Sequence, residues 1–392
     1  MHSHFTSKLL NLKDCFVHKI SHSETAVKIS ISTKPRPSTC PICGKVTTKV
    51  HDYRNQVLKD LPLMTKNTIL LLRKRRYVCS CGKRFYESYE FLPKYRRMTN
   101  RLAAYIVHEL RNATPMAAVA DKANVSAHTV SRVFRMIQYD RPSSLPKVLA
   151  IDEFKGNAGS EKYQCILVDP KKRAILDILP DRRQNHLIDY FKSYSKHERL
   201  KVHFFVCDMW KPYADLARTF FPNASIVVDK YHFIRQVSWA IENVRKRIQK
   251  TMIPALRKYF KRSRSLILKR TEKLKPHEKE QLDIMLLYSD DLRQAYKLKE
   301  AFYAICQHER YSVQRKAFYD WIQYAEQVQL PEFNACITAF RNWSKEILNA
   351  FKYGYTNGCT EGFNNKIKVL KRVSYGVRDF DRFRNRILHI CS

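Results

Sequence analysis

The sequence predicts a mixed α/β domain with a large α-helical insertion, preceded by a zinc-ribbon-like module and a helix-turn-helix domain. Three observations predict this order: two cysteine pairs near the N-terminus, helical periodicity with turn residues at 99–139, and short apolar runs that alternate with helices after residue 148. We expect the zinc-binding module at residues 1–95, the helix-turn-helix domain at 96–141 and the α/β domain at 146–392, with its insertion at about 235–350.

Composition limits the class of protein. Across 392 residues, 73 Lys and Arg stand against 36 Asp and Glu, a formal net charge of +37. A basic excess spread along the whole chain most often indicates a polyanionic partner, and nucleic acid is the first expectation. No apolar run is long enough to span a membrane, so we expect no membrane partner. The first residues lack a signal-peptide core and the 11 cysteines are an odd number, so we expect a reducing, cytoplasmic location.

Strand-like segments dominate the first module. Residues 15–20 and 26–32 read as a β-hairpin, and residues 45–57 and 67–78 are two further strand-like runs. The basic run at 73–76 is either a phosphate-contacting stripe or a solvated face.

The cysteine pairs lie at the ends of these runs. Cys40 and Cys43 are separated by two residues and Cys79 and Cys81 by one, and each pair is followed by a glycine that lets a tight turn close. Two such turns can present four thiolates to one ion. We therefore expect structural Zn²⁺ rather than four unrelated reduced cysteines.

Residues 99–139 have the pattern of a helix-turn-helix. Thr99 and Ser126 are suited to cap helices, Pro115 to the first turn of one, and Asn124 to a left-handed turn between two. The alternative is an ordinary helical hairpin, but the basic charge favours DNA binding. The candidate contacts are the outward positions of the second helix: His128, Thr129, Ser131, Arg132 and Arg135.

The α/β domain begins with three strand-like runs at residues 148–154, 162–168 and 174–179, which we expect to be antiparallel. A helix at 185–193, a strand at 202–207, a helix at 212–221 and a strand at 224–228 follow. This alternation predicts a mixed five-stranded sheet. Residues 233–350 are helical and basic with no comparable strand pattern, so we expect them to form an insertion.

Asp152, Asp208 and Asp229 each follow an apolar run. Such a carboxylate either faces water or belongs to a site, because burying an unpaired charge is costly. If the fourth strand lies parallel beside the first, Asp152 and Asp208 become neighbours. Two carboxylates forced together either share a proton or hold a divalent cation.

A third carboxylate lies far downstream. Glu361 follows a glycine-containing lead and shares one face of a predicted helix with four polar residues, Asn364, Asn365, Lys368 and Arg372. A carboxylate beside amides and cations suits a metal next to a phosphate backbone. The alternative is a solvated face whose Glu is simply favoured at a helix N-terminus.

Taken together, these residues resemble the ISL3 family of bacterial insertion-sequence transposases over nearly the whole chain. The resemblance is carried by the two cysteine pairs and by six further motifs: Ala150-Ile-Asp-Glu-Phe154, Asp181-Arg182, Asp208-Met-Trp210-Lys-Pro-Tyr213, Val227-Val-Asp-Lys-Tyr-His232, Glu361-Gly-Phe-Asn-Asn-Lys-Ile-Lys368 and Tyr375-Gly.

The resemblance implies an RNase H-like catalytic domain whose DDE triad would be Asp152, Asp208 and Glu361. Asp229 and His232 would support that site or contact DNA. The three carboxylates would hold two Mg²⁺ (or Mn²⁺) ions roughly 4 Å apart, with no covalent protein–DNA intermediate.

The implied activity is metal-dependent strand cleavage at each element end, followed by attack of the freed 3′-hydroxyl on target DNA. The partners would be double-stranded DNA at the terminal inverted repeats, read by the two N-terminal modules, and at the target. Pairing two DNA ends makes a homodimer the natural expectation. Two alternatives remain: a catalytically inactive transposase-derived DNA-binding regulator, and another RNase H-like nuclease.

Overall fold

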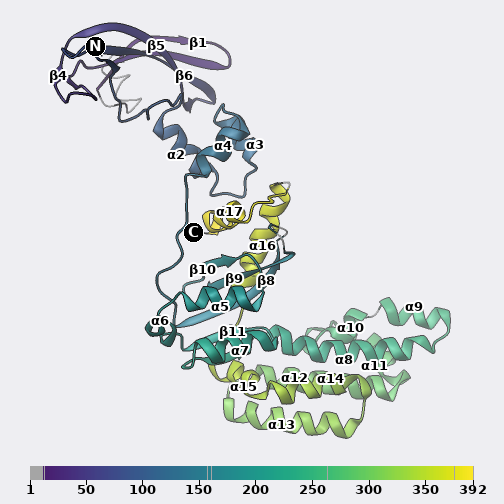
Figure 1. Cartoon of the computed structure of the whole chain (residues 1–392). Coiled ribbons are helices and arrows are strands. Elements are labelled where there is room, and N and C mark those ends of the chain that lie inside the picture. Colours follow the sequence, from purple (N-terminus) through teal and green to yellow (C-terminus); the bar gives the residue numbers. More distant parts are fainter. Residues whose placement is uncertain are drawn as a thin grey trace. The chain divides into compact units, whose positions relative to one another are not determined.

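The computed structural model describes residues 12, 14–156, 158–159, 161–262, 264–374 and 376–391 (Figure 1). Residues 1–11 and Tyr375, which belongs to one of the motifs above, lie outside these ranges. Contacts within the chain define two compact units: Met1–Asp140 with Lys366–Ser392, and Arg141–Asn365. Within the described ranges, every helix is too short or too polar to cross a membrane.

The first unit begins with a β-sheet in the strand order β1-β2-β6-β5, with β7 paired to β6. The predicted hairpin is confirmed, because β1 and β2 pair antiparallel, and β5 and β6 form a second antiparallel pair. Alternate residues of β2 and β6, such as Ile29 and Leu70, point into one apolar cluster. The strands are β1 (Cys15–His22), β2 (Ala26–Thr33), β3 (Ser38–Thr39), β4 (Val46–Thr47), β5 (Val50–Leu63), β6 (Lys66–Val78) and β7 (Arg84–Tyr86).

Three short helices follow: α2 (Asn100–Glu109), α3 (Met116–Lys122) and α4 (Ala127–Phe134). Both predicted caps are present, since the hydroxyls of Thr99 and Ser126 accept hydrogen bonds from the backbone N–H groups of Leu102 and Thr129. Asn124 adopts the left-handed conformation with φ of 50° between α3 and α4, as the turn requires. The helix-turn-helix prediction is confirmed.

The C-terminal helix α17 (Phe380–Cys391) belongs to this same unit and packs on the three helices. His389 lies between the Tyr139 hydroxyl, 2.7 Å from Nδ1, and the Val107 carbonyl, 2.8 Å from Nε2. The buried Arg386 guanidinium donates to three backbone carbonyls that follow α2, those of Leu110, Asn112 and Thr114. The expected boundary of the α/β domain at residue 392 is therefore wrong for this helix, because Lys366–Ser392 belongs to the first unit.

The second unit is built on a sheet in the order β10-β9-β8-β11-β12. The first three strands pair antiparallel and the last two are parallel to β8, which confirms the predicted mixed five-stranded sheet. Its elements are β8 (Val148–Lys155), β9 (Tyr163–Asp169), β10 (Ala174–Leu179), α5 (Gln184–Lys192), α6 (Lys196–Leu200), β11 (Phe204–Cys207), α7 (Lys211–Phe220) and β12 (Ser225–Val228). One sheet face packs on α5 and α7 through Phe191, Phe205 and Tyr213.

A helical insertion follows β12, with α8 and α12 side by side (Figure 1). Buried aromatic rings such as Phe302, Trp321 and Phe340 form much of its interior. Its elements are α8 (Lys230–Lys250), α9 (Pro254–Arg262), α10 (Arg264–Leu268), η1 (Thr271–Lys273), α11 (Pro276–Tyr288), α12 (Asp290–Gln307), α13 (Tyr311–Val328), η2 (Pro331–Phe333), α14 (Asn334–Asn342) and α15 (Ser344–Tyr353). The chain then enters α16 (Gly358–Val373).

Candidate active site and zinc centre

The parallel pairing of β8 and β11 brings two carboxylates together. Phe204 pairs with Val148 and Val206 with Ala150, and the same register continued by two residues sets Asp208 opposite Asp152. Asp152 lies inside its strand rather than at a solvent-facing end, and its side chain is half-buried. The expected neighbour relationship between the two carboxylates is therefore present.

Burial and the nearby Asp208 charge raise the pKa of Asp152 to about 7. Two hydrogen bonds partly oppose this rise. The Glu153 backbone N–H donates to Oδ1 of Asp152 at 2.7 Å, and the Asn364 amide donates to Oδ2 at 3.0 Å. Two like charges held close with so few donors form a site that a cation would stabilise.

His232 faces this pair from the first turn of α8. Its Nε2 lies 2.8 Å from a buried carboxylate oxygen of Asp208. Burial by itself would lower the pKa of His232, but contact with Asp208 raises it overall. Asp208 therefore favours the protonated form of His232, and the 2.8 Å contact orients the Asp208 carboxylate.

Asp229 has a different position in the site. One of its oxygens accepts the Tyr231 backbone N–H as the N-cap of α8, and the other accepts the Asn357 backbone N–H. Both oxygens therefore bind backbone, and Asp229 fixes the start of α8.

Glu361 lies in the first turn of α16 and is exposed. Within the described ranges, the four cysteines are the one group of three or more His, Cys, Asp or Glu residues whose ligand atoms all lie within 4.8 Å of one another. Asn364, one turn after Glu361, reaches Asp152 instead, and its buried Oδ1 has no hydrogen-bond partner in the described part of the chain. An unpaired amide oxygen beside two carboxylates is a hard-ligand set that suits Mg²⁺.

The motif residues Arg182 and Tyr213 meet at Glu153, the neighbour of Asp152. The Arg182 guanidinium and the Tyr213 hydroxyl each donate to Glu153 at 2.9 Å. Both residues belong to motifs that carry the family resemblance, and here they are the partners of Glu153. The need for such partners could have been predicted from the sequence. Glu153 directly follows Asp152, and burying a second carboxylate there without a partner would be costly.

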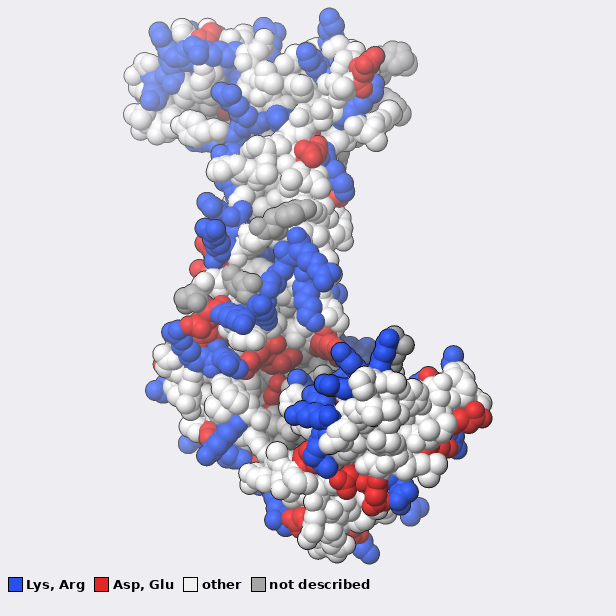
Figure 2. All heavy atoms as spheres, turned by 90° about the vertical axis from the view of Figure 1, so that its right-hand side faces the viewer, with Lys and Arg blue, Asp and Glu red and all other residues white. Residues whose placement is uncertain are grey.

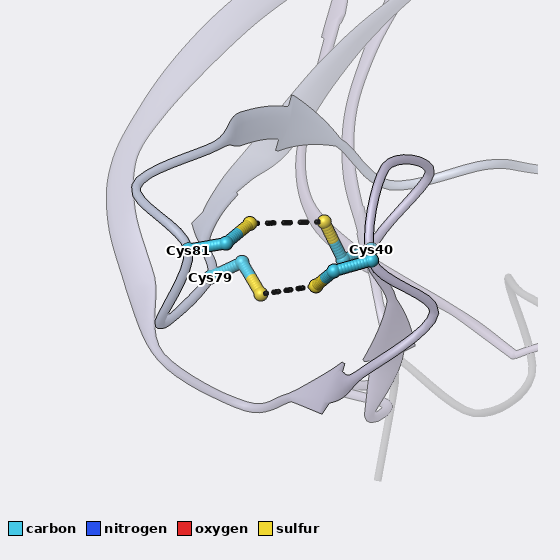
Figure 3. Close-up of side chains that lie close together, drawn as sticks. Cys40, Cys79 and Cys81 are labelled. Atoms are coloured by element: carbon cyan, nitrogen blue, oxygen red, sulfur yellow. Dashed lines mark hydrogen bonds between the residues drawn. The ribbon is translucent and has the colours of Figure 1, made fainter.

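Four thiols meet at the edge of the first sheet (Figure 3). The Sγ atoms of Cys40 and Cys81 lie 3.7 Å apart, and those of Cys43 and Cys79 lie 3.4 Å apart. Four sulfurs bonded at about 2.3 Å in a tetrahedron lie about 3.8 Å from one another, so the spacing fits Zn²⁺. The backbone N–H of Cys81 lowers the pKa of Cys79 to about 6, which favours the thiolate that a metal binds.

Four of the five predicted contacts of α4 are available to DNA. His128, Arg132 and Arg135 are exposed and Thr129 is half-exposed. The expectation for Ser131 is wrong: its side chain is buried, and its hydroxyl accepts a hydrogen bond from Arg382 of α17. Sequence periodicity could not reveal a helix from the far end of the chain packed over this position.

The remaining predicted contacts lie on α16. Asn365, Lys368 and Arg372 are exposed, whereas Asn364 is half-buried and engaged with Asp152. Lys and Arg side chains are spread widely over the face that Figure 2 shows, in keeping with the +37 charge. Such a surface suits a phosphate backbone.

Comparisons with known proteins agree with this organisation. A family model described as a transposase (DDE_Tnp_ISL3) matches residues 149–387. A zinc-finger model of the transposases IS204/IS1001/IS1096/IS1165 matches residues 36–81, and the helix-turn-helix model of transposase family ISL3 matches residues 87–137. The zinc, helix-turn-helix and DDE regions therefore follow one another as the sequence predicts.

Two curated proteins are also similar. The "Transposase for insertion sequence element IS1001" of Bordetella parapertussis is 28% identical over 365 residues, which is 91% of this chain and 89% of that protein. A Lactococcus lactis subsp. lactis protein named "ATP-dependent protease" is 34% identical over 112 residues, but the match covers only 27% of this chain and 33% of that protein. The first match spans nearly both chains and therefore carries more weight.

A zinc ribbon and a helix-turn-helix, followed by a DDE domain on a mixed sheet, define a DNA transposase. The chain belongs to the ISL3 family of insertion-sequence transposases.

Proposed function

We propose that this chain cleaves DNA at the terminal inverted repeats of its element and transfers the freed 3′ ends to target DNA, with Asp152, Asp208 and Glu361 as catalytic carboxylates. The single observation that carries the proposal is the register that sets Asp208 opposite Asp152. An RNase H-like fold for this domain is supported by its strand order, with three antiparallel strands followed by two parallel ones.

The carboxylates of Asp152 and Asp208 and the free Oδ1 of Asn364 would hold Mg²⁺ or Mn²⁺, in a two-ion arrangement. Bound there, the metal would activate an attacking water or hydroxyl and stabilise the leaving oxygen. His232 keeps Asp208 oriented through the 2.8 Å contact. We infer that Glu361 completes the set when DNA and metal are present, because it lies one turn before Asn364 on the same helix face.

DNA recognition is assigned to both units. His128, Thr129, Arg132 and Arg135 of α4 would read the inverted repeats, while Asn365, Lys368 and Arg372 of α16 would contact phosphates. We propose the zinc module at 1–95, the helix-turn-helix at 96–141 and the catalytic domain from 146 to 365. The expected boundary at 392 is corrected, because Lys366–Ser392, which includes α17, belongs to the first unit and completes the helix-turn-helix. Synapsis of two ends would use a homodimer.

A plasmid that carries this gene with its native flanking DNA provides the test. Purified protein is incubated with Mg²⁺, and wild type is compared with Asp152→Ala, Asp208→Ala and Glu361→Ala. We expect metal-dependent nicks at the element ends that all three variants lose while they still bind the ends. Loss of binding together with cleavage would contradict the catalytic assignment.

One observation favours a second candidate, an inactive DNA-binding regulator: Glu361 is exposed and not grouped with Asp152 and Asp208 at ligand distance. The same plasmid assay decides between the two. End binding by a well-folded wild type that never nicks DNA would favour the regulator.

A further inference from the structure

We propose that the exposed face of α8 binds unpaired nucleotides of the DNA end beside the carboxylate cluster. The inference deepens the proposed function and rests on it, since it names the form of DNA that the site takes. We call this face the α8 stripe, and it consists of Tyr231, Arg235, Trp239, Asn243, Lys246 and Lys250.

The spacing of the six residues places them on one side of α8. The members of the stripe recur every three or four residues, so they lie along one side of the helix. All of them are exposed, whereas intervening residues such as Phe233, Val237 and Ile241 are buried against the rest of the insertion. The stripe is therefore the solvent face of α8.

In the first half of the stripe, the Arg235 side chain lies between two aromatic rings, those of Tyr231 and Trp239. Tyr231 is 63% exposed and Trp239 is 47% exposed, although rings of this size usually bury most of their surface. The Arg235 guanidinium lies 4.1 Å from the Trp239 ring centroid and 5.9 Å from that of Tyr231. Two flat rings held apart by a planar cation are suited to stack with bases, because every base offers a flat π face.

The second half of the stripe carries positive charge. Asn243, Lys246 and Lys250 continue the line, and no Asp or Glu lies among the six stripe residues. The acidic residues near this part of α8 are paired with other cations: Glu242 with Arg245 and Arg264, and Asp291 and Glu332 with Arg247. Aromatic rings beside lysines are suited to bind a nucleic-acid strand, because bases can stack on the rings and the lysines can bind phosphates.

The stripe begins at the carboxylate cluster. Tyr231 directly precedes His232, which contacts Asp208, and Asp229 caps the same helix. At 1.5 Å per residue, Trp239 lies eight residues after Tyr231 and therefore about 12 Å further along the helix axis. A strand cleaved there would pass along the stripe, and its first nucleotides would have to be unpaired to reach the rings.

The test measures DNA binding in the full-length protein without Mg²⁺, so that its readout does not depend on strand cleavage. The probes are the native element end as a fully paired duplex, and the same end with a short unpaired extension at the flank. Fluorescence anisotropy compares wild type with Trp239→Ala and Trp239→Phe. The control is Tyr319→Ala, which removes a ring of α13 that is 43% exposed.

We expect Trp239→Ala to weaken binding to the extended end on the order of ten-fold, the effect of losing one stacked base, and to change paired-duplex binding by less than about two-fold. Trp239→Phe should retain most of the affinity, and the control should change neither. Of the four tryptophans, all within the described ranges, Trp239 is the exposed one, so oligo(dT) should quench wild-type fluorescence far more than that of Trp239→Phe.

Equal weakening on both probes, or no change on either, would overturn the inference. A variant that altered the oligomeric state but not DNA binding would also overturn it, because the stripe would then be a protein-contact surface. Failure of the plasmid cleavage assay would refute the catalytic assignment and leave these binding results intact, so the two proposals can fail separately.

Discussion

Asp229 and Asn357 are 128 residues apart in the chain and meet at the site, where a carboxylate oxygen of Asp229 accepts the Asn357 backbone N–H at 2.9 Å. The second oxygen of Asp229 caps α8, and the Asn357 side chain donates to the Ile151 carbonyl of β8. The Asn357 carbonyl in turn accepts the Glu361 N–H in the first turn of α16. One buried carboxylate thus ties the helix of His232 to the helix of Glu361.

Substitution of Asp229 should weaken DNA cleavage because the helices that carry His232 and Glu361 would lose their fixed positions, not because a catalytic group is lost. In Asp229→Ala both N–H groups lose their acceptor, which should lower the free energy of unfolding by about 1–3 kcal/mol. Asp229→Asn retains one acceptor oxygen and should lose less. Urea unfolding and plasmid nicking are the measurements, and binding of the element end should stay unchanged. An Asp229→Ala protein with normal stability would contradict this role.

The raised pKa of Asp152 predicts a particular pH dependence of stability. Because the pKa is about 7 in the folded protein and near 4 in the unfolded chain, the folded state binds more protons between those values. Stability of the metal-free protein should therefore fall as pH rises from about 4 to about 7. Asp152→Asn should remove this loss and be more stable than wild type at pH 8, by on the order of 1–3 kcal/mol.

Urea unfolding at pH 5 and pH 8 in Mg²⁺-free buffer checks this expectation, with Asp283→Asn, which changes an exposed carboxylate of α11, as control. Added Mg²⁺ should stabilise wild type at pH 8 more than Asp152→Asn, because only the wild type keeps the ligand. If wild type and Asp152→Asn differed in stability by the same amount at pH 5 and at pH 8, Asp152 would not titrate between these pH values.

His232 should act as a positioning residue for Asp208. Its replacement by Ala leaves a buried carboxylate oxygen without its partner, so we expect nicking to fall by roughly 10- to 100-fold and the Mg²⁺ concentration needed for half-maximal nicking to rise. His232→Gln can still donate to Asp208 and should recover part of the activity. An unchanged Mg²⁺ requirement in His232→Ala would argue against a link between this residue and the metal.

Helix α17 should stabilise the helix-turn-helix. Arg386→Met removes a buried guanidinium that donates to three carbonyls and lies over the Phe134 ring, and should cost at least about 2 kcal/mol of stability. Binding to the element end should weaken in parallel, because α4 loses its support. The exposed Arg378→Met is the matched control, and equal effects of the two substitutions on melting temperature would refute the prediction.

The cysteine cluster should bind one zinc ion per chain. Cys40→Ser should lower the zinc content measured by atomic absorption and partly unfold the first sheet, because metal binding there is coupled to folding. Cys306→Ser in the insertion is the control and should retain zinc. Full zinc content in Cys40→Ser would exclude Cys40 as a ligand.

Local residue patterns predicted much of this protein. The alternating apolar runs gave the five strands of the mixed sheet, and Thr99, Asn124 and Ser126 specified caps and a turn that depend only on neighbouring residues. The metal site could also be predicted, because the spacing within each cysteine pair is a local property of the sequence. The helical insertion, expected at about 235–350, spans α8 to α15.

Only the tertiary structure decided which side chains are partners. The parallel register of β8 and β11 sets Asp208 opposite Asp152, Asn364 turns to Asp152, and α17 covers Ser131 from more than 240 residues away. The physical reason is that capping and strand periodicity depend on a few neighbouring residues, whereas these contacts depend on how distant elements pack together.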